Sequence, residues 1–112
     1  MMKKTLNKII DYAAAVSDAN SIVLFGSMAN GTYNIYSDID LLIITDNTAM
    51  KRDIVDLIKN FSAELSLKAD VQVYSKSEIE KESETPHSFI GGILQSGRVV
   101  YGKNLDNYIE KR

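Results

Sequence analysis

Two short groups of residues in the first half of the chain have the types and spacing that phosphate chemistry needs. Gly26 and Ser27 follow an apolar run, and Asp38 and Asp40 open a second apolar run after ten intervening residues. Glycine accepts positive φ and lets a ligand approach the backbone closely. A short helix starting at Ser27 would present free N–H groups and a positive dipole end. We therefore expect Gly26 and Ser27 to cradle a phosphate.

The two carboxylates of the second group suit a metal ion. On a strand, side chains two residues apart share one face, so the Cα atoms of Asp38 and Asp40 would lie roughly 6.6 Å apart. Unit charges 4 Å apart repel each other by about 4 kcal/mol at an effective dielectric constant near 20, and a divalent cation relieves that repulsion. Oxygen ligands favour Mg²⁺, with Mn²⁺ as the alternative. The pair thus indicates a cation site for phosphate chemistry.

A third acid follows in a segment with strand-like alternation. Asp70, Gln72 and Tyr74 alternate with Val71 and Val73, as on a half-buried strand. If this strand neighbours the one carrying Asp38 and Asp40, Asp70 completes a two-metal cluster that can activate an attacking hydroxyl. The alternatives are a solvated loop for the first two acids, an ordinary turn for Gly26 and Ser27, and a surface acid for Asp70.

Taken together, Gly26-Ser27, ten residues, Asp38-x-Asp40 and the downstream Asp70 resemble the minimal nucleotidyltransferase group of the DNA polymerase β-like superfamily. The match runs from about Ser21 to Tyr74. The resemblance implies that Gly26 and Ser27 bind the triphosphate and that Asp38 and Asp40 hold two metal ions. It also implies that Asp70 joins the metal site and helps to position and deprotonate the acceptor hydroxyl.

One departure from the family concerns the residues after the glycine-serine turn. Many members carry an arginine there, whereas residues 28–30 of this chain are Met, Ala and Asn. Arginine offers bidentate phosphate contacts that methionine and asparagine cannot make. The missing arginine favours an alternative in which the chain binds its partner without catalysis.

The fold class expected from these patterns is α/β, a small mixed sheet with helices packed against it. The runs at residues 21–25 and 39–44 are typical of central strands covered on both faces. Two apolar stripes with helical spacing should pack on the sheet. The first is Leu6, Ile9, Ile10, Ala13 and Val16, and the second is Met50, Ile54, Leu57, Ile58, Phe61 and Leu65.

The boundaries of the later elements are predicted from capping and turn residues. Residues 45–48 should cap the helix of the second stripe. The charged run at residues 76–84 is expected to be a solvated helix or a loop. Thr85 and Pro86 should start a helix with Phe89, Ile90, Ile93 and Leu94 inward, ended by Gly97. A short edge strand at residues 98–102 and a weak helix at residues 105–111 complete the prediction.

The composition of the chain limits the classes of function that we expect. The 112 residues are 45% hydrophobic and 25% charged, and they have a net charge of −2 and no cysteine. We expect residues 1–112 to form one soluble, cytoplasmic domain, because the chain has no transmembrane-length apolar run and no signal peptide. Without a basic face, direct binding to nucleic acid is not expected.

The predicted function is metal-dependent transfer of a nucleoside monophosphate, AMP from ATP, to a hydroxyl of a partner protein. The resemblance implies that the partner is a HEPN-domain toxin and that this chain is its antitoxin. Two alternatives stay open: an antitoxin that neutralises by docking alone, and an aminoglycoside-type small-molecule nucleotidyltransferase built on a homo-oligomer. The only histidine, His87, and the loop tyrosines, Tyr33 and Tyr36, are expected to be structural.

Overall fold

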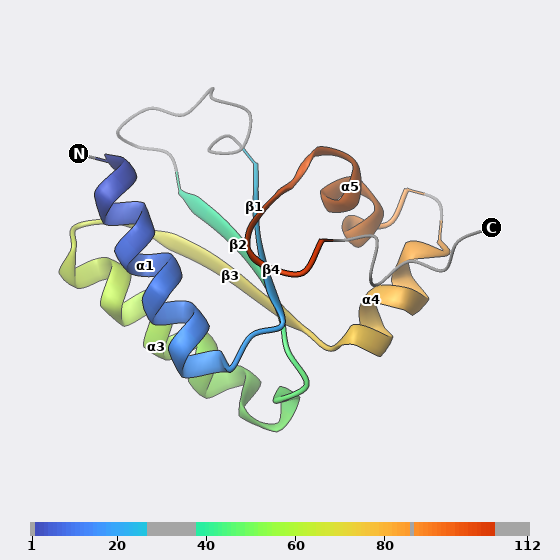
Figure 1. Cartoon of the computed structure of the whole chain (residues 1–112), viewed down its shortest axis with the longest axis horizontal. Helices are drawn as coiled ribbons and strands as arrows, with labels where there is room; N and C mark the ends of the chain where they lie inside the picture. Colours follow the sequence, from blue (N-terminus) through green and yellow to red (C-terminus); the bar gives the residue numbers. More distant parts are fainter. Residues whose placement is uncertain (1, 27–37, 86, 105–112) are drawn as a thin grey trace.

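The computed structural model describes residues 2–26, 38–85 and 87–104 (Figure 1). Its strands form one sheet in the order β3-β2-β1-β4, with β1 antiparallel to β2 and β4, and β2 parallel to β3. This mixed sheet with packed helices confirms the predicted α/β class. The elements are α1 (Met2–Ser17), β1 (Ser21–Phe25), β2 (Ile39–Ile44), a 3₁₀ turn (Thr48–Met50), α3 (Lys51–Glu64), β3 (Ala69–Tyr74), α4 (Lys76–Ser83), α5 (Phe89–Ser96) and β4 (Arg98–Gly102).

Helices cover the sheet on both faces. In Figure 1, α1 and α3 lie on one side of the strands, and α4 and α5 lie on the other. Alternation along β2 sends Leu41 and Ile43 into the core with α1 and α3, and Leu42 and Ile44 into a second core with α4 and α5. Burying each such side chain contributes about 1.5–3 kcal/mol. The prediction of central strands covered on both faces is confirmed for β2.

The crossover through α3 makes β2 and β3 parallel, since parallel neighbours need a long connection. Their register pairs Ile39 with Ala69 and Asp40 with Asp70, continuing to Ile44 with Tyr74. Both strands therefore begin at the same end of the sheet. This connection brings acids that are thirty residues apart in sequence onto one edge of one face.

The second predicted stripe is only partly inward. Ile54 and Ile58 are buried, but Met50 and Leu57 are 47% and 43% exposed, so their predicted burial is wrong. The expected cap is also wrong: α3 begins at Lys51 after the 3₁₀ turn, and its N-cap residue makes no side-chain cap bond. Thr45, which belonged to that cap, is buried, and its hydroxyl donates to the carbonyl of Ser17 at 2.8 Å. It ties the end of β2 to α1 instead.

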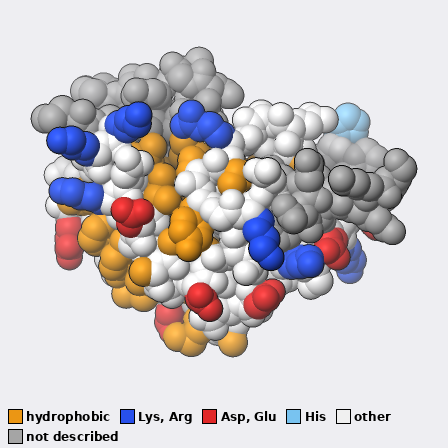
Figure 2. Space-filling view, viewed as in Figure 1, with side chains coloured by type: hydrophobic (Ala, Val, Ile, Leu, Met, Phe, Trp, Pro, Cys, Tyr) orange, Lys and Arg blue, Asp and Glu red, His pale blue; other side chains and the backbone are white. Residues whose placement is uncertain are grey.

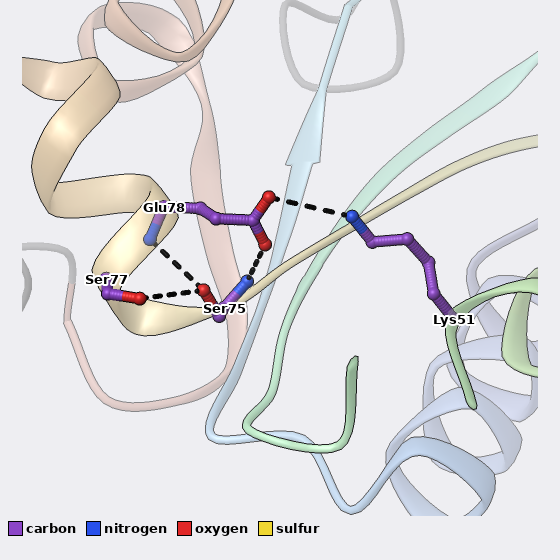
Figure 3. Close-up of polar contacts among 4 residues, drawn as sticks. All are labelled: Lys51, Ser75, Ser77 and Glu78. Carbon is purple, nitrogen blue, oxygen red and sulfur yellow. Dashed lines mark hydrogen bonds and ion pairs between the residues drawn. The ribbon is translucent and has the colours of Figure 1, made fainter. Parts of the chain in front are cut away.

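The charged run forms helix α4, whose first turn is stabilised by the two hydrogen bonds of a capping box (Figure 3). The Ser75 hydroxyl accepts from the backbone N–H of Glu78 at 3.1 Å, and the Glu78 carboxylate accepts from that of Ser75 at 2.9 Å. The same carboxylate lies 3.7 Å from the ammonium of Lys51, the first residue of α3. The backbone N–H of Ser75 and, secondarily, Lys51 lower the pKa of Glu78. The hydrogen bonds stabilise the first turn of α4, and the ion pair links it to the start of α3.

Helix α5 begins later than predicted. Its N-cap is Ser88, whose hydroxyl accepts from the backbone N–H of Gly91 at 2.9 Å, so the helix starts at Phe89 and not at Pro86. That start leaves Phe89 50% exposed, which corrects the prediction of an inward side chain, while Ile90 and Ile93 are buried as expected. Gly97 ends the helix, and β4 is an edge strand, as predicted. Pro86 and the expected helix at residues 105–111 lie outside the described residues.

The surface shows no helix suited to a bilayer and no single basic patch on the face that is drawn. Among the described residues, no helix is both long and apolar enough to span a membrane. Figure 2 shows Lys and Arg side chains in two separate groups, one over α1 and one on the side of α4 and β4, with Asp and Glu side chains beside both.

Candidate active site

Three aspartates converge at the starts of β2 and β3. Asp38 immediately precedes β2, and Asp40 lies in register with Asp70 on the parallel neighbour. Residues paired across strands share a face, here the one that carries Leu42 and Ile44. Asp38 and Asp40 are half-buried and Asp70 is exposed, whereas Leu42 and Ile44 are buried under α4 and α5. The acids thus occupy the open end of an otherwise covered face.

Gly26 lies against this acidic end. It follows β1 directly and has a φ of +73°, as expected for the predicted sharp turn. A Cβ atom added at Gly26 would collide with the carboxylate oxygen Oδ2 of Asp40. Only glycine combines this backbone conformation with that close approach. The turn and the Asp40 carboxylate are therefore immediate neighbours.

The electrostatics of the site favour a bound cation. Burial raises the pKa of Asp40 above its ordinary value, and the nearby charges of Asp70 and Asp38 raise it further. Carboxylates that repel one another in this way are hard oxygen donors of the kind that Mg²⁺ prefers. Within residues 2–26, 38–85 and 87–104, no three His, Cys, Asp or Glu side chains form a group placed to hold a metal ion. The donor types fit a cation, but the three side chains do not already enclose one.

Several predicted positions lie outside the described residues. These are Ser27, the segment 28–30 that lacks the arginine, and both loop tyrosines, Tyr33 and Tyr36. His87 is described: it is exposed, in the turn before α5, with a φ of +62°. The described part of the chain thus places four of the five predicted site residues, Gly26, Asp38, Asp40 and Asp70, at one end of the sheet.

Two pockets lined by described residues lie away from the acids. One, of about 300 Å³, is lined by Tyr74, Glu78, Lys81, Glu82 and Thr85. Tyr74 ends β3 four residues after Asp70, roughly 13 Å along the strand. The other, of about 510 Å³, lies between the end of α3 and the start of β3 and includes Lys59 and Lys68. Neither pocket is lined by any of the three aspartates.

An aromatic pair beside the acids was not predicted. Phe25 lies in register with Asp40, and its ring meets that of Phe89 from α5 edge to face, with centroids 5.7 Å apart. The alternation in residues 21–25 assigns faces within that strand. It does not reveal the residue opposite Phe25, because the long connection between β1 and β2 sets no hairpin register.

Comparison with known proteins agrees with this geometry. The profile of a family described as "Polymerase beta, Nucleotidyltransferase" matches residues 7–106, which include Gly26 and all three aspartates. The chain belongs to this nucleotidyltransferase family. Membership assigns it the transfer of nucleotidyl groups as its class of reaction and supports the resemblance seen in the sequence.

Two relatives in this family come from Methanocaldococcus jannaschii, and both are named as candidate protein adenylyltransferases. The first, MJ1305, is 30% identical over 124 residues, covering 99% of this chain and 83% of that protein. The second, MJ0604, is 35% identical over 82 residues, covering 71% of this chain and 76% of that protein. Both alignments therefore cover most of each protein.

Solved structures share the fold of this nucleotidyltransferase. A chain from a toxin–antitoxin crystal structure with AMP-PNP has a TM-score of 0.57 and 17% identity, covering 89% of this chain and 76% of that one. A chain from the tri-AMPylated Shewanella oneidensis HEPN toxin in complex with its MNT antitoxin has a TM-score of 0.54 and 18% identity, covering 96% and 77%. A Sulfolobus solfataricus nucleotidyltransferase candidate has a TM-score of 0.56 and 18% identity, covering 91% and 81%. At these identities the likeness concerns the fold.

Proposed function

We propose that this nucleotidyltransferase moves AMP from ATP onto a hydroxyl of a partner protein, and that it thereby acts as the antitoxin of a HEPN-domain toxin. The observation that carries the proposal is the placement of Asp40 and Asp70 side by side on parallel strands, with the Gly26 turn against the Asp40 carboxylate. That arrangement joins a phosphate-binding turn to a set of acids on an open face, which a protein acceptor can reach.

The choice of AMP and of a protein acceptor is supported by the relatives. Both M. jannaschii proteins are named for protein adenylyl transfer. One of the solved structures that contains a chain with this fold is a tri-AMPylated HEPN toxin in complex with an MNT antitoxin. The cytoplasm remains the expected compartment.

The proposed reaction is an in-line displacement at the α-phosphorus of ATP. The acceptor hydroxyl oxygen forms the new P–O bond, the bond to the β-phosphate breaks, and pyrophosphate leaves with the electron pair. Gly26 and Ser27 orient the triphosphate. Asp70 positions the acceptor hydroxyl and takes up its proton, as the family resemblance implies.

Asp38, Asp40 and Asp70 are the residues that would hold Mg²⁺, two ions by resemblance, with Mn²⁺ as the alternative. Their carboxylate oxygens suit both ions, and burial first, then the charges of Asp70 and Asp38, raise the pKa of Asp40. Bound ions would neutralise phosphate charge and lower the pKa of the attacking hydroxyl.

The test uses purified chain, ATP labelled in the α-phosphate, Mg²⁺ and the product of the adjacent gene. We expect label on the partner protein with the wild type and none with the Asp38→Asn, Asp40→Asn double variant. Asp56→Asn, which changes an exposed carboxylate on α3, is the matched control and should label normally. Absence of label from wild-type reactions with any of the four nucleotides would refute the reaction.

The same variants separate catalysis from docking. The segment 28–30, which lacks the arginine common in the family, favours a chain that neutralises its partner by binding alone. If the double variant protects cells from the partner as well as the wild type does, docking suffices. Loss of protection with an intact complex supports nucleotidyl transfer as the cause.

A further inference from the structure

Asp70 and Asp40 form a row across two neighbouring strands of the candidate active site, and the next strand continues this row with an aromatic residue. Asp70 on β3, Asp40 on β2 and Phe25 on β1 lie in register across three neighbouring strands. Residues paired in this way share one face, and adjacent strands lie about 4.8 Å apart. The face therefore presents, in order, an exposed acid, a half-buried acid and an aromatic ring.

The Phe25 ring supports a second ring that faces solvent. Phe89, the first residue of α5, meets Phe25 at 5.7 Å between centroids and at 85° between ring planes. Phe25 also packs against the core formed with α4 and α5. Phe89 is 50% exposed, although Ile90 and Ile93 on the same helix are buried. A supported aromatic surface thus stands open beside the acids.

The two sides of Asp40 differ in chemistry. Asp70, on the β3 side, is the acid assigned to the acceptor hydroxyl. Gly26, which follows Phe25 on the β1 side, starts the phosphate-binding turn. The donor triphosphate would therefore lie on the β1 side of the row, which is also the side of Phe25 and Phe89.

We infer that Phe89, supported by Phe25, is the surface on which the base of the donor nucleotide stacks. The inference rests on the proposed nucleotidyl transfer and adds a binding residue for its donor. Every base has a π-face, so a ring contributes affinity without reading hydrogen bonds. A larger purine covers more of the ring than a pyrimidine does. Stacking on this ring therefore favours a purine over a pyrimidine only by contact area, and it does not separate adenine from guanine.

The test measures binding apart from turnover. Wild type and Phe89→Leu are titrated calorimetrically with AMP-PNP and Mg²⁺, and separately with tripolyphosphate, which has no base. Phe89→Leu should bind AMP-PNP about tenfold more weakly and tripolyphosphate unchanged, since loss of one stacking contact costs about that factor. Phe89→Tyr keeps the ring and should stay within about twofold of wild type.

Tyr101→Leu is the matched control, because Tyr101 is another exposed aromatic residue, at 42%. It pairs with Ile22, three residues from Phe25 on β1 and so roughly 10 Å away along the strand. It should leave the affinity for AMP-PNP unchanged. An equal loss in the Tyr101 variant would show that the effect is not local and would overturn the inference.

Other outcomes of these measurements would overturn the inference or the proposed reaction. If Phe89→Leu binds AMP-PNP as the wild type does, or weakens tripolyphosphate equally, the ring does not hold the base. A raised KM for the partner protein with unchanged AMP-PNP affinity would assign the ring to the acceptor and likewise overturn the inference. Wild type that binds AMP-PNP in a Phe89-dependent way but transfers nothing would refute the proposed reaction and leave the base site standing.

Discussion

Neutralising Asp40 should stabilise the folded chain while removing activity. Asp40 and Asp70 are in register on adjacent strands, which are about 4.8 Å apart. Two unit charges at that separation repel by about 0.9 kcal/mol at the dielectric constant of water and by about 3.5 kcal/mol at a constant of 20. Because Asp70 is exposed, the lower end applies, and we expect Asp40→Asn to raise the free energy of unfolding by about 1 kcal/mol.

The assay is thermal unfolding in EDTA at pH 7. For a chain of 112 residues, 1 kcal/mol corresponds to a rise in Tm of about 4 °C. Asp56→Asn, on the exposed side of α3, should not change Tm by more than about 2 °C, since surface substitutions usually change stability by less than about 0.5 kcal/mol.

The pH dependence follows from the raised pKa of Asp40. Burial raises the pKa of Asp40 most, and the charges of Asp70 and Asp38 raise it further. The folded state therefore holds a proton on Asp40 that the unfolded chain loses near pH 3.8. The folded state binds more protons in that window, so the stability contributed by this group falls as pH rises above 3.8. The difference between Asp40→Asn and wild type should therefore be largest near neutral pH and disappear below pH 3.8.

Adding Mg²⁺ should reverse the order of the two melting temperatures. If the proposed metal site exists, the wild type gains stability from an ion that binds only the folded state, whereas Asp40→Asn would lack one of the proposed ligands. An Asp40→Asn variant that melts at or below the wild type in EDTA would refute the argument that repulsion accumulates at this site. An equal rise in the Asp56 variant would refute its attribution to the acidic cluster.

Three further substitutions have expected outcomes. Gly26→Ala should abolish nucleotidyl transfer and lower stability by about 1–3 kcal/mol, because its Cβ would meet the Asp40 carboxylate at a positive φ; labelled transfer and denaturant unfolding measure both. Ser75→Ala removes the capping box of α4 and should cost about 1 kcal/mol in denaturant unfolding with transfer retained. Thr45→Val leaves the buried carbonyl of Ser17 without this donor and should cost about 1–3 kcal/mol, measured in the same way.

The sequence was sufficient to predict which end of the sheet carries the candidate active site. Alternation alone places Asp38 and Asp40 on one face, and the four aliphatic residues that follow them indicate a strand buried on both sides. Gly26 was predictable as a turn because it sits between an apolar strand and a polar loop. The prediction that Asp70 joins the other two acids depended on its strand lying beside β2. The register of β2 and β3 shows that the two strands are neighbours.

Other features could not be predicted because the sequence offers more than one residue for the same role, and its patterns do not show which residue takes that role. Both Thr85, before Pro86, and Ser88 could cap α5, and Ser88 does so, which leaves Phe89 exposed. Helical spacing groups Leu57 with its apolar neighbours, yet only the docked position of α3 decides which part of a wide stripe meets the sheet. The pairing of Phe25 with Asp40 depends on strand register across a long connection.

The position of α4 matters for how the active site is reached. Its first turn is held at the end of β3 opposite Asp70 by the capping box and by the contact between Lys51 and Glu78. From there α4 contributes Ile79 to the core over Leu42 and Ile44, and Asp70 stays exposed. A helix shifted toward the start of β3 would bury the acids and would block the protein acceptor that we propose. The arrangement of the acids themselves is maintained by the register of β2 and β3 and does not depend on this anchor, so Ser75→Ala should lower stability and leave transfer intact.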